Sequence, residues 1–459
     1  MDAVVERPAT RAPGPTSLRD AFSVWGQISL AGIGGAALQL ATMHRLLVQA
    51  KRWISEDRFF HALSYCIAMP GPETQQLSIY IGWLTNRTFG GVIAGGLFVL
   101  PGVVCMMALT FGYVTGGDSP FGHAISLGIR PAILAVMAEG ILRFGRHVLH
   151  SPSMAVLATA SFIAAFIRVP FPIIMTTAGL IGAIAVLSGY RGLARPIPAA
   201  KYGPAEAAEH RELPEHAEPN LKRFIVTLAF WLVLWLTPPI TLLAVFGLHN
   251  IFTQISLLFG KVALMAVGGD YAVVAYATEQ VVTSYHWLSS REAQEGIAMG
   301  EMVPGTIMIV TQFLGSVAAF RHPGELPPLV AGALGGLLAT WMTMCPCFLW
   351  IMLIAPFLEG LRRNTFLNST MQAVTAGAVG MILNLSVWFG LRTVFGHIER
   401  IHFSYFRFDF PTFATVDFWA LVLFLCALLA VFRFKIGTAA TLIGSSAVGV
   451  ALYMLGLAV

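Results

Sequence analysis

Long apolar stretches joined by short polar segments restrict this fold more than any other feature of the chain. A membrane-spanning helix needs about 20 mostly apolar residues, and only 11% of the residues are charged, against about 25% in a typical soluble chain. The sequence therefore predicts an all-α integral membrane protein with about 13 transmembrane helices. The stretches run approximately over residues 22–43, 62–84, 88–113, 122–142, 154–169, 171–190, 224–247, 252–283, 297–320, 329–357, 366–394, 415–432 and 436–457.

The polar segments divide the chain into four parts. Residues 1–21 are polar and rich in Pro, Ala and Arg, which predicts a disordered cytoplasmic tail. Residues 191–223 carry five prolines among mixed charges and are interpreted as a cytoplasmic linker. The linker separates an N-terminal half, residues 22–190, from a C-terminal half, residues 224–459.

Residues 34–71 resemble residues 268–305 when the sequence is aligned with itself without a gap. The repeat begins at the first apolar stretch in one half and at the eighth in the other, so seven crossings would separate the copies and invert them. Inverted repeats with broken helices are typical of secondary transporters, which bind their substrate near mid-membrane between the repeats. The matched residues are Gly34-Gly35 with Gly268-Gly269, Trp53 with Trp287, Ser55 with Ser289, and Pro70-Gly71 with Pro304-Gly305.

Loop charge predicts the orientation. Lys and Arg are more frequent in the loops that face inward if the N-terminus is cytoplasmic and the C-terminus is outside. This bias explains the net charge of +5 better than nucleic-acid binding does. The basic loop 44–61 disagrees, because it falls outside in this count. It would move inside if 22–43 or 62–84 were a re-entrant hairpin, and both alternatives remain open.

The candidate substrate site lies where Pro and Gly interrupt the apolar stretches. Broken helices at membrane depth belong against protein or a water-filled cavity, and the start of a resumed helix offers free N–H groups and a positive dipole end to an anion. The alternative is that Pro and Gly only kink tightly packed helices. The break residues singled out are Gly34, Gly35, Pro70, Gly71, Gly268, Gly269, Pro304 and Gly305.

Polar side chains beside these breaks could complete the site. Gln75 and Gln76 can donate amide hydrogen bonds to an oxyanion, and Thr74 and Thr306 can donate hydroxyls. Glu73 either stabilises the first turn of its helix or carries a coupling proton. Asp270, after the second Gly-Gly pair, is the other coupling candidate.

Two cations within the spans are further candidates. Neither Arg130 nor Lys261 has a carboxylate at helical spacing, so both could compensate the charge of a substrate dianion. Alternatively, Arg130 snorkels to an interface and Lys261 pairs with a carboxylate of another span.

Enzyme chemistry has little support in this sequence. The chain has no nucleophile elbow, no metal-spaced His pair and no phosphate-cradling loop, so no metal or cofactor is expected. Cys345-Pro346-Cys347 lacks the spacing of a zinc or redox pair, and the five cysteines are interpreted as packing residues.

Several motifs resemble the chromate ion transporter family, in order along nearly the whole chain. They include Met43-His44-Arg45, Arg52-Trp53-Ile54-Ser55-Glu56, Pro70-Gly71-Pro72-Glu73 with Gln75-Gln76, Tyr80-Ile81-Gly82-Trp83, Trp287-Leu288-Ser289, and Cys345-Pro346-Cys347-Phe348-Leu349-Trp350.

The resemblance implies a two-domain transporter that exports chromate from the bacterial cytoplasm across the plasma membrane, driven by the proton motive force. Sulfate, an isosteric dianion, is the alternative substrate of the same fold. The expected partners are the dianion, protons and lipid. The sequence leaves the oligomeric state open, with a homodimer as one option.

Overall fold

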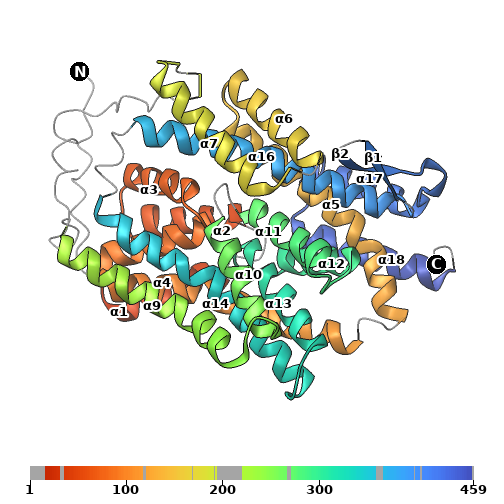
Figure 1. Cartoon of the computed structure of the whole chain (residues 1–459), viewed down its shortest axis with the longest axis horizontal. Coiled ribbons are helices and arrows are strands. Elements are labelled where there is room, and N and C mark those ends of the chain that lie inside the picture. The colour runs from red at the N-terminus through yellow and green to blue at the C-terminus, as the bar shows by residue number, and fades with distance from the viewer. Residues whose placement is uncertain are drawn as a thin grey trace, which may run out of the picture.

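A computed structural model of the chain describes residues 16–30, 36–116, 120–167, 169–190, 192–193, 220–265, 270–357, 365–396, 398–403 and 406–456. Helices dominate (Figure 1), which confirms the all-α membrane fold. The helices before the linker are α1 (Leu18–Leu30), α2 (Ala36–Met43), α3 (Glu56–Ala68), α4 (Glu73–Gly116), α5 (Pro120–Val148), α6 (Pro152–Phe166) and α7 (Phe171–Leu187). After it come α9 (Leu221–Phe246), α10 (Ile251–Leu264), α11 (Asp270–Glu279), α12 (Ser290–Met302), α13 (Val310–Arg321), α14 (Pro328–Ile354), α16 (Thr365–Val394), α17 (Phe418–Phe432) and α18 (Thr438–Met454).

Four segments of the described chain are long and apolar enough to cross a membrane: Glu73–Gly116, Leu221–Phe246, Pro328–Phe357 and Ser369–Val394. Several apolar helices of the described chain are shorter, with 10–17 residues. The helix assigned to Glu73–Gly116 is itself two helices, which meet at the non-helical residues Asn86 and Arg87.

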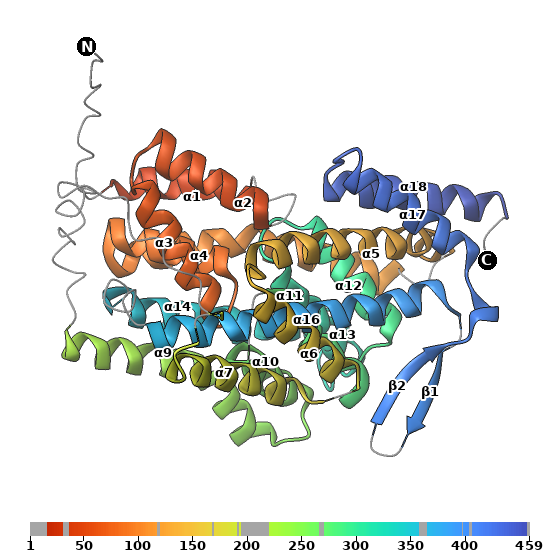
Figure 2. The same cartoon turned by 90° about the horizontal axis from the view of Figure 1, so that it is seen from above.

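A β-hairpin between α16 and α17 was not expected from the sequence. Strand β1 (Ile398–Phe403) pairs antiparallel with β2 (Phe406–Pro411), and Figure 2 shows the hairpin projecting away from the helices. Phe406-Arg407-Phe408-Asp409-Phe410 alternates aromatic and charged residues, as a strand does.

The starts of α1 and α9 share one face of the molecule. The Asn86 side chain donates to the Thr16 carbonyl (2.6 Å), which places the α1 start at the kink of α4. Trp83 and Thr88 on either side of this kink share a pocket with Asn220 and Arg223 at the α9 start. Helix α9 has 26 residues and is about 39 Å long, enough to cross a bilayer. Because α10 begins directly after α9, α1 and α10 start on opposite faces, here called the N-terminal face and the opposite face.

The backbone repeats its unusual features in both halves. Arg52 and His286 have positive φ values of 52° and 54°, and Gly71 and Gly305 have φ values of 118° and 124°. A π-helical turn precedes each short loop, at His44–Ala50 and at Gln280–Ser284. These matches, with the opposite starts of α1 and α10, confirm two inverted repeats.

Helices α12 and α13 form a re-entrant hairpin. At the end of α13, Arg321 donates to Glu292 (3.0 Å) in the first turn of α12 and to the Trp287 carbonyl (2.9 Å), so both helix ends share the opposite face. The apolar stretch 297–320 therefore does not cross the membrane as one span. It turns at Pro304-Gly305 and returns to the opposite face. Burial disfavours the charged form of Glu292, but hydrogen bonds from Arg321 and Ser289 outweigh burial and hold its pKa below the ordinary value.

The first repeat has the same backbone features around α3 and the first part of α4. Helix α3 packs against α4, and Figures 1 and 2 both place it at the same end of the molecule as α1. Of the two alternatives that the sequence left open, the re-entrant one thus fits the structure. It moves the basic loop 44–61 to the N-terminal face and removes the exception to the charge rule.

Helices of the two halves interlock. In Figure 2, α5 lies along α17 and α18, while α16 lies along α6 and α7. Glycines allow the close approach: Ser445 donates to the Gly128 carbonyl (2.7 Å), and a Cβ on Gly182 would lie 2.6 Å from that of Ala373. The domain boundaries at 190 and 224 stay a prediction, and packing crosses them.

We predict that Lys51 and Tyr285, which precede the equivalent tryptophans Trp53 and Trp287, face opposite sides of the membrane. Single-cysteine variants at the two positions should react with an impermeant maleimide from opposite sides, in intact cells for one and everted vesicles for the other. Labelling of both from the same side would contradict the inverted arrangement.

Candidate functional site

Residues of both repeats meet where the helices are broken. A Cβ on Gly102 of α4 would lie 2.5 Å from the Pro304 carbonyl oxygen, so the tip of the α12–α13 hairpin touches α4. The Gln39 amide of α2, oriented to suit its neighbours, pairs with both the N–H (3.0 Å) and the carbonyl (3.3 Å) of Gly305. Gln312 of α13 donates to the Val103 carbonyl (2.9 Å). The two repeats therefore hold each other through backbone groups at the breaks.

Glycine is required at both breaks, for partly different reasons. Gly71 and Gly305 adopt φ values of 118° and 124°, which L side chains rarely tolerate. At Gly71 a Cβ would also lie 2.8 Å from both Cys347 Sγ and Gln76 Nε2, whereas the space beside Gly305 is open.

The first turn of α4 carries buried polar atoms without partners. Gln75 is 0% exposed, and neither its amide nitrogen nor its oxygen has a hydrogen-bond partner among the described residues. The Thr74 hydroxyl and Glu73 Oε2 are buried and unpartnered there in the same way. Buried polar atoms are normally paired, so this turn is suited to a polar ligand.

Gln76 has a different, structural role. Its amide nitrogen donates to the Pro70 carbonyl (2.5 Å) and its backbone N–H to the Pro72 carbonyl (3.0 Å). Both hydrogen bonds stabilise the backbone conformation of the break. Its Oε1 has no partner within the described ranges.

The equivalent turn of the second repeat has no such polar set. Ile307, Met308, Ile309 and Val310 follow the second break, and the Thr306 hydroxyl accepts from the Met308 N–H (3.1 Å). Thr306 is thus a helix cap. The two breaks match in backbone and differ in chemistry.

The two candidate cations lie apart from these turns. Arg130 contacts Glu295 of α12 (3.4 Å), a carboxylate from another helix that helical spacing could not reveal. Lys261 is exposed on the same face of α10 as Leu257 and Leu264, with its ammonium 5.9 Å from the centre of the Tyr276 ring. The structure brings neither side chain to Glu73–Gln76.

Five other predicted residues lie outside what the structure describes. Gly34, Gly35, Gly268 and Gly269 are not among the described residues, and Asp270 begins α11 without a described side chain. In the described part of the chain, no three His, Cys, Asp or Glu side chains gather where a metal could bind.

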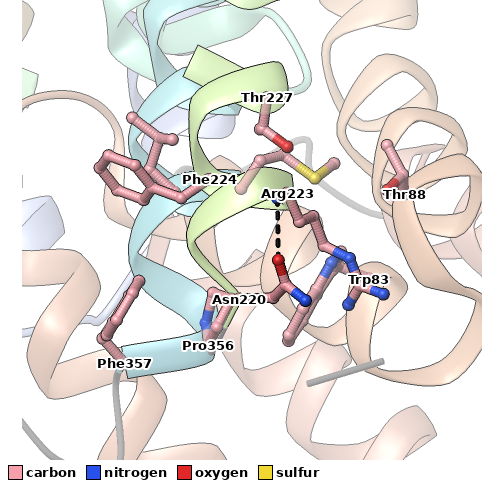
Figure 3. Close-up of a pocket in the computed structure, with 10 residues that line it drawn as sticks. Trp83, Thr88, Asn220, Arg223, Phe224, Thr227, Pro356 and Phe357 are labelled. Carbon is pink, nitrogen blue, oxygen red and sulfur yellow. Dashed lines mark hydrogen bonds between the residues drawn. The ribbon is translucent and has the colours of Figure 1, made fainter. Parts of the chain in front are cut away.

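A separate pocket opens at the N-terminal face (Figure 3). It encloses ≈ 390 Å³ between the kink of α4, the start of α9 and the end of α14. Asn220 Oδ1 accepts from the Arg223 backbone N–H (3.2 Å), and the Arg223 side chain extends toward Trp83. The pocket thus lies at the far end of the helical segment that begins at Glu73.

Comparison with known proteins identifies the family. The sequence model of the chromate transporter family matches residues 19–183 and 253–450, which make up most of the chain. The chain belongs to the chromate transporter family. The matched segments leave out α9, which connects the repeats. This chromate transporter family member is a multi-pass membrane protein and an ion transporter.

Curated relatives agree with this assignment. The chain is 27% identical to a chromate transport protein of Pseudomonas aeruginosa over 81% of this chain and 80% of the relative. It is 25% identical to one of Cupriavidus metallidurans over 84% and 88%, respectively. A probable chromate transport protein of Synechococcus elongatus is 23% identical over 82% and 86%. No solved structure matches the chain.

Sequence reasoning missed Gln39, Tyr113, Arg291 and Glu295. Gln39 is an amide inside an apolar stretch, which could have signalled a contact at membrane depth. Arg291 and Glu295 are four residues apart and resemble an ordinary exposed helix pair, so the burial of Glu295 against Arg130 and Tyr113 had no local signal.

We predict that Gln75→Leu keeps or raises the thermal stability of the purified protein. The substitution removes an unpaired buried amide, whose burial costs about 1–3 kcal/mol. Gln312→Leu is the matched control: its amide nitrogen bonds Val103 and its oxygen accepts from Thr340 (3.1 Å), so it should melt earlier. Thermal unfolding followed by tryptophan fluorescence tests both, and a large loss of stability in Gln75→Leu would show that Gln75 is structural.

We also predict that Gly71→Ala is more harmful than Gly305→Ala. Both introduce strain of about 1–3 kcal/mol at a positive φ, but only the Cβ at position 71 collides with a side chain. Membrane abundance and melting temperature of the two variants give the order, and equal or reversed losses would contradict it.

Proposed function

We propose that this chain is a secondary transporter that exports chromate, or a similar oxyanion dianion, across the bacterial plasma membrane. The observation that carries the proposal is the set of buried, unpartnered donors in the first turn of α4. The names of the curated relatives support chromate as the substrate.

The first turn of α4 can bind a tetrahedral oxyanion without a full countercharge. The N–H groups at a helix start lack partners within the helix and carry the positive end of the dipole. Thr74 and Gln75 add a hydroxyl and an amide in the same turn. A dianion that leaves water thus exchanges its hydration for several oriented donors.

In this proposal Pro70, Gly71 and Gln76 shape the break, Pro304, Gly305 and Thr306 shape the opposing hairpin tip, and Thr74 and Gln75 contact the anion. Both glycine pairs, Gly34-Gly35 and Gly268-Gly269, remain candidates for the facing wall. Arg130 and Lys261 remain proposed contributors of positive charge at other points of the path.

The N-terminal face is proposed to be cytoplasmic. The basic loop 44–61 and the α9 start with Lys222 and Arg223 share that face, in line with the charge rule. The C-terminus is then outside the cell.

Glu73 is the favoured proton carrier, and Asp270 the second candidate. Glu73 Oε2 is buried beside Thr74 and Gln75 and accepts no hydrogen bond from the described residues. A carboxylate next to a dianion site is strongly coupled to its occupancy, because like charges repel at low dielectric.

Transport into everted membrane vesicles tests the function. Vesicles with the wild-type chain should accumulate radioactive chromate when a pH gradient is imposed, and excess sulfate should lower uptake if the site accepts any such dianion. Gln75→Leu, at equal membrane abundance, should lose most of the transport. No chromate uptake by the wild type, with sulfate uptake instead, would favour the sulfate transporter.

Proton coupling is tested by Glu73→Gln. Because glutamine cannot release a proton, this variant should lose the stimulation of uptake by a pH gradient but still bind chromate. Unchanged stimulation would remove Glu73 from the coupling step, and Asp270→Asn is then the variant to compare.

A further inference from the structure

Four side chains from three helices meet near the opposite face, around Glu295. Its carboxylate accepts from the Tyr113 hydroxyl of α4 (2.7 Å) and from Arg291 Nε of α12 (3.0 Å), and Arg130 Nη2 of α5 lies 3.4 Å away. The Glu295 side chain is only 5% exposed. Of these four residues only Arg130 was among the predicted site residues.

Among its described members the cluster has more positive than negative charge. Arg130 and Arg291 supply two guanidinium groups to one carboxylate, and arginine cannot lose its proton to balance this. Arg130 makes the longer contact, and its Nε is buried without a hydrogen-bond partner among the described residues. One buried donor of the cluster is therefore available to a further acceptor.

The position of Arg291 adds to this imbalance. It lies in the first turn of α12, where the helix dipole favours anions over cations. A bound oxyanion there would contact the cation and the positive helix end together. Guanidinium groups suit tetrahedral oxyanions because they donate two parallel hydrogen bonds.

The cluster is also accessible and lies beside the α12–α13 hairpin. The side chains of Arg291 and Arg130 are 39% and 24% exposed. Tyr113 is close to the end of α4 at the opposite face, and its ring contacts Phe313 of the hairpin arm α13, 5.3 Å between ring centres.

We propose that Arg130, Arg291 and Tyr113 form a second oxyanion site, which Glu295 occupies in this structure as a resident counter-anion. The dianion that leaves the first turn of α4 displaces the Glu295 carboxylate from the two arginines on its way to the opposite face. When the anion departs, Glu295 returns and prevents the arginines from retaining it. The inference rests on the proposed function for the identity of the anion, but the site itself is tested by binding.

The test measures binding of radioactive sulfate to the purified full-length chain in lipid nanodiscs. Gln75→Leu serves as the background, because it removes the first site. In this background Glu295→Gln should tighten sulfate binding about tenfold or more, since each tenfold corresponds to one charge-assisted hydrogen bond gained. The single variant Glu295→Gln should transport more slowly than wild type, because the anion is retained.

Two further variants place the effect at this cluster. Adding Arg130→Gln to the variant that carries Gln75→Leu and Glu295→Gln should abolish the gain in sulfate affinity. Glu292→Gln is the matched control: it neutralises a carboxylate of the same helix that pairs with Arg321 and Ser289, outside the Glu295 cluster, and it should not tighten binding. If Glu295→Gln does not reach the membrane, Glu295→Asp, which withdraws the carboxylate, should show a smaller gain in the same direction.

Sulfate affinity that stays the same or weakens after Glu295→Gln or Glu295→Asp in the Gln75→Leu background would overturn the proposal and leave the cluster a structural ion pair. Failure of the proposed function gives a different result. In that case the wild type transports neither chromate nor sulfate, while Glu295→Gln still binds sulfate more tightly.

Discussion

The requirement that every backbone polar group be paired within the bilayer determines most of this structure. Proline at Pro101, Pro346 and Pro238 leaves the carbonyl four residues earlier without its helical donor. Each of these carbonyls receives a side chain from a neighbouring helix: Ser29 donates to Leu97 (2.6 Å), Trp235 to Met342 (3.0 Å) and Trp341 to Leu234 (3.3 Å). The prolines thus specify which helices pack together. Trp235 and Trp341 illustrate this directly, because α9 and α14 exchange these bonds in both directions.

The same requirement explains why the repeats match in backbone but differ in function. Both breaks need a glycine at positive φ, so Gly71 and Gly305 coincide. The backbone groups at the two breaks are paired differently: Gln39 of the other repeat bonds Gly305, whereas Gln76 of the same repeat bonds Pro70. In the first turn of the resumed helix, only the first repeat then retains unpaired polar side-chain atoms, at Thr74 and Gln75, among the described residues. The duplicated fold thus has a polar turn after the break of the first repeat and an apolar turn after the break of the second.

Much of the fold could be predicted from the sequence, because apolar length and Pro-Gly spacing are local signals. The repeat, the breaks and the polar turn at Glu73–Gln76 all follow from them. The re-entrant course of α12 and α13 could not be decided, since it depends on the contact of Arg321 with Glu292 across the hairpin. The partner of Arg130 was missed for a similar reason, because Glu295 lies on a distant helix. The β-hairpin was missed because its alternation is confined to a few residues between two apolar stretches.

The interlocked helices have a consequence for how the protein is made. Helix α5 is synthesised long before α17 and α18, which cover it, and α16 is needed to cover α6 and α7. Until the second half has been synthesised, the glycine-lined surfaces of the first half, such as that around Gly128, must therefore contact lipid. Completion of the second half closes both sets of contacts together. Two separately expressed halves, divided within residues 191–219, would have to assemble on each other to become stable, as the two subunits of an obligate heterodimer do.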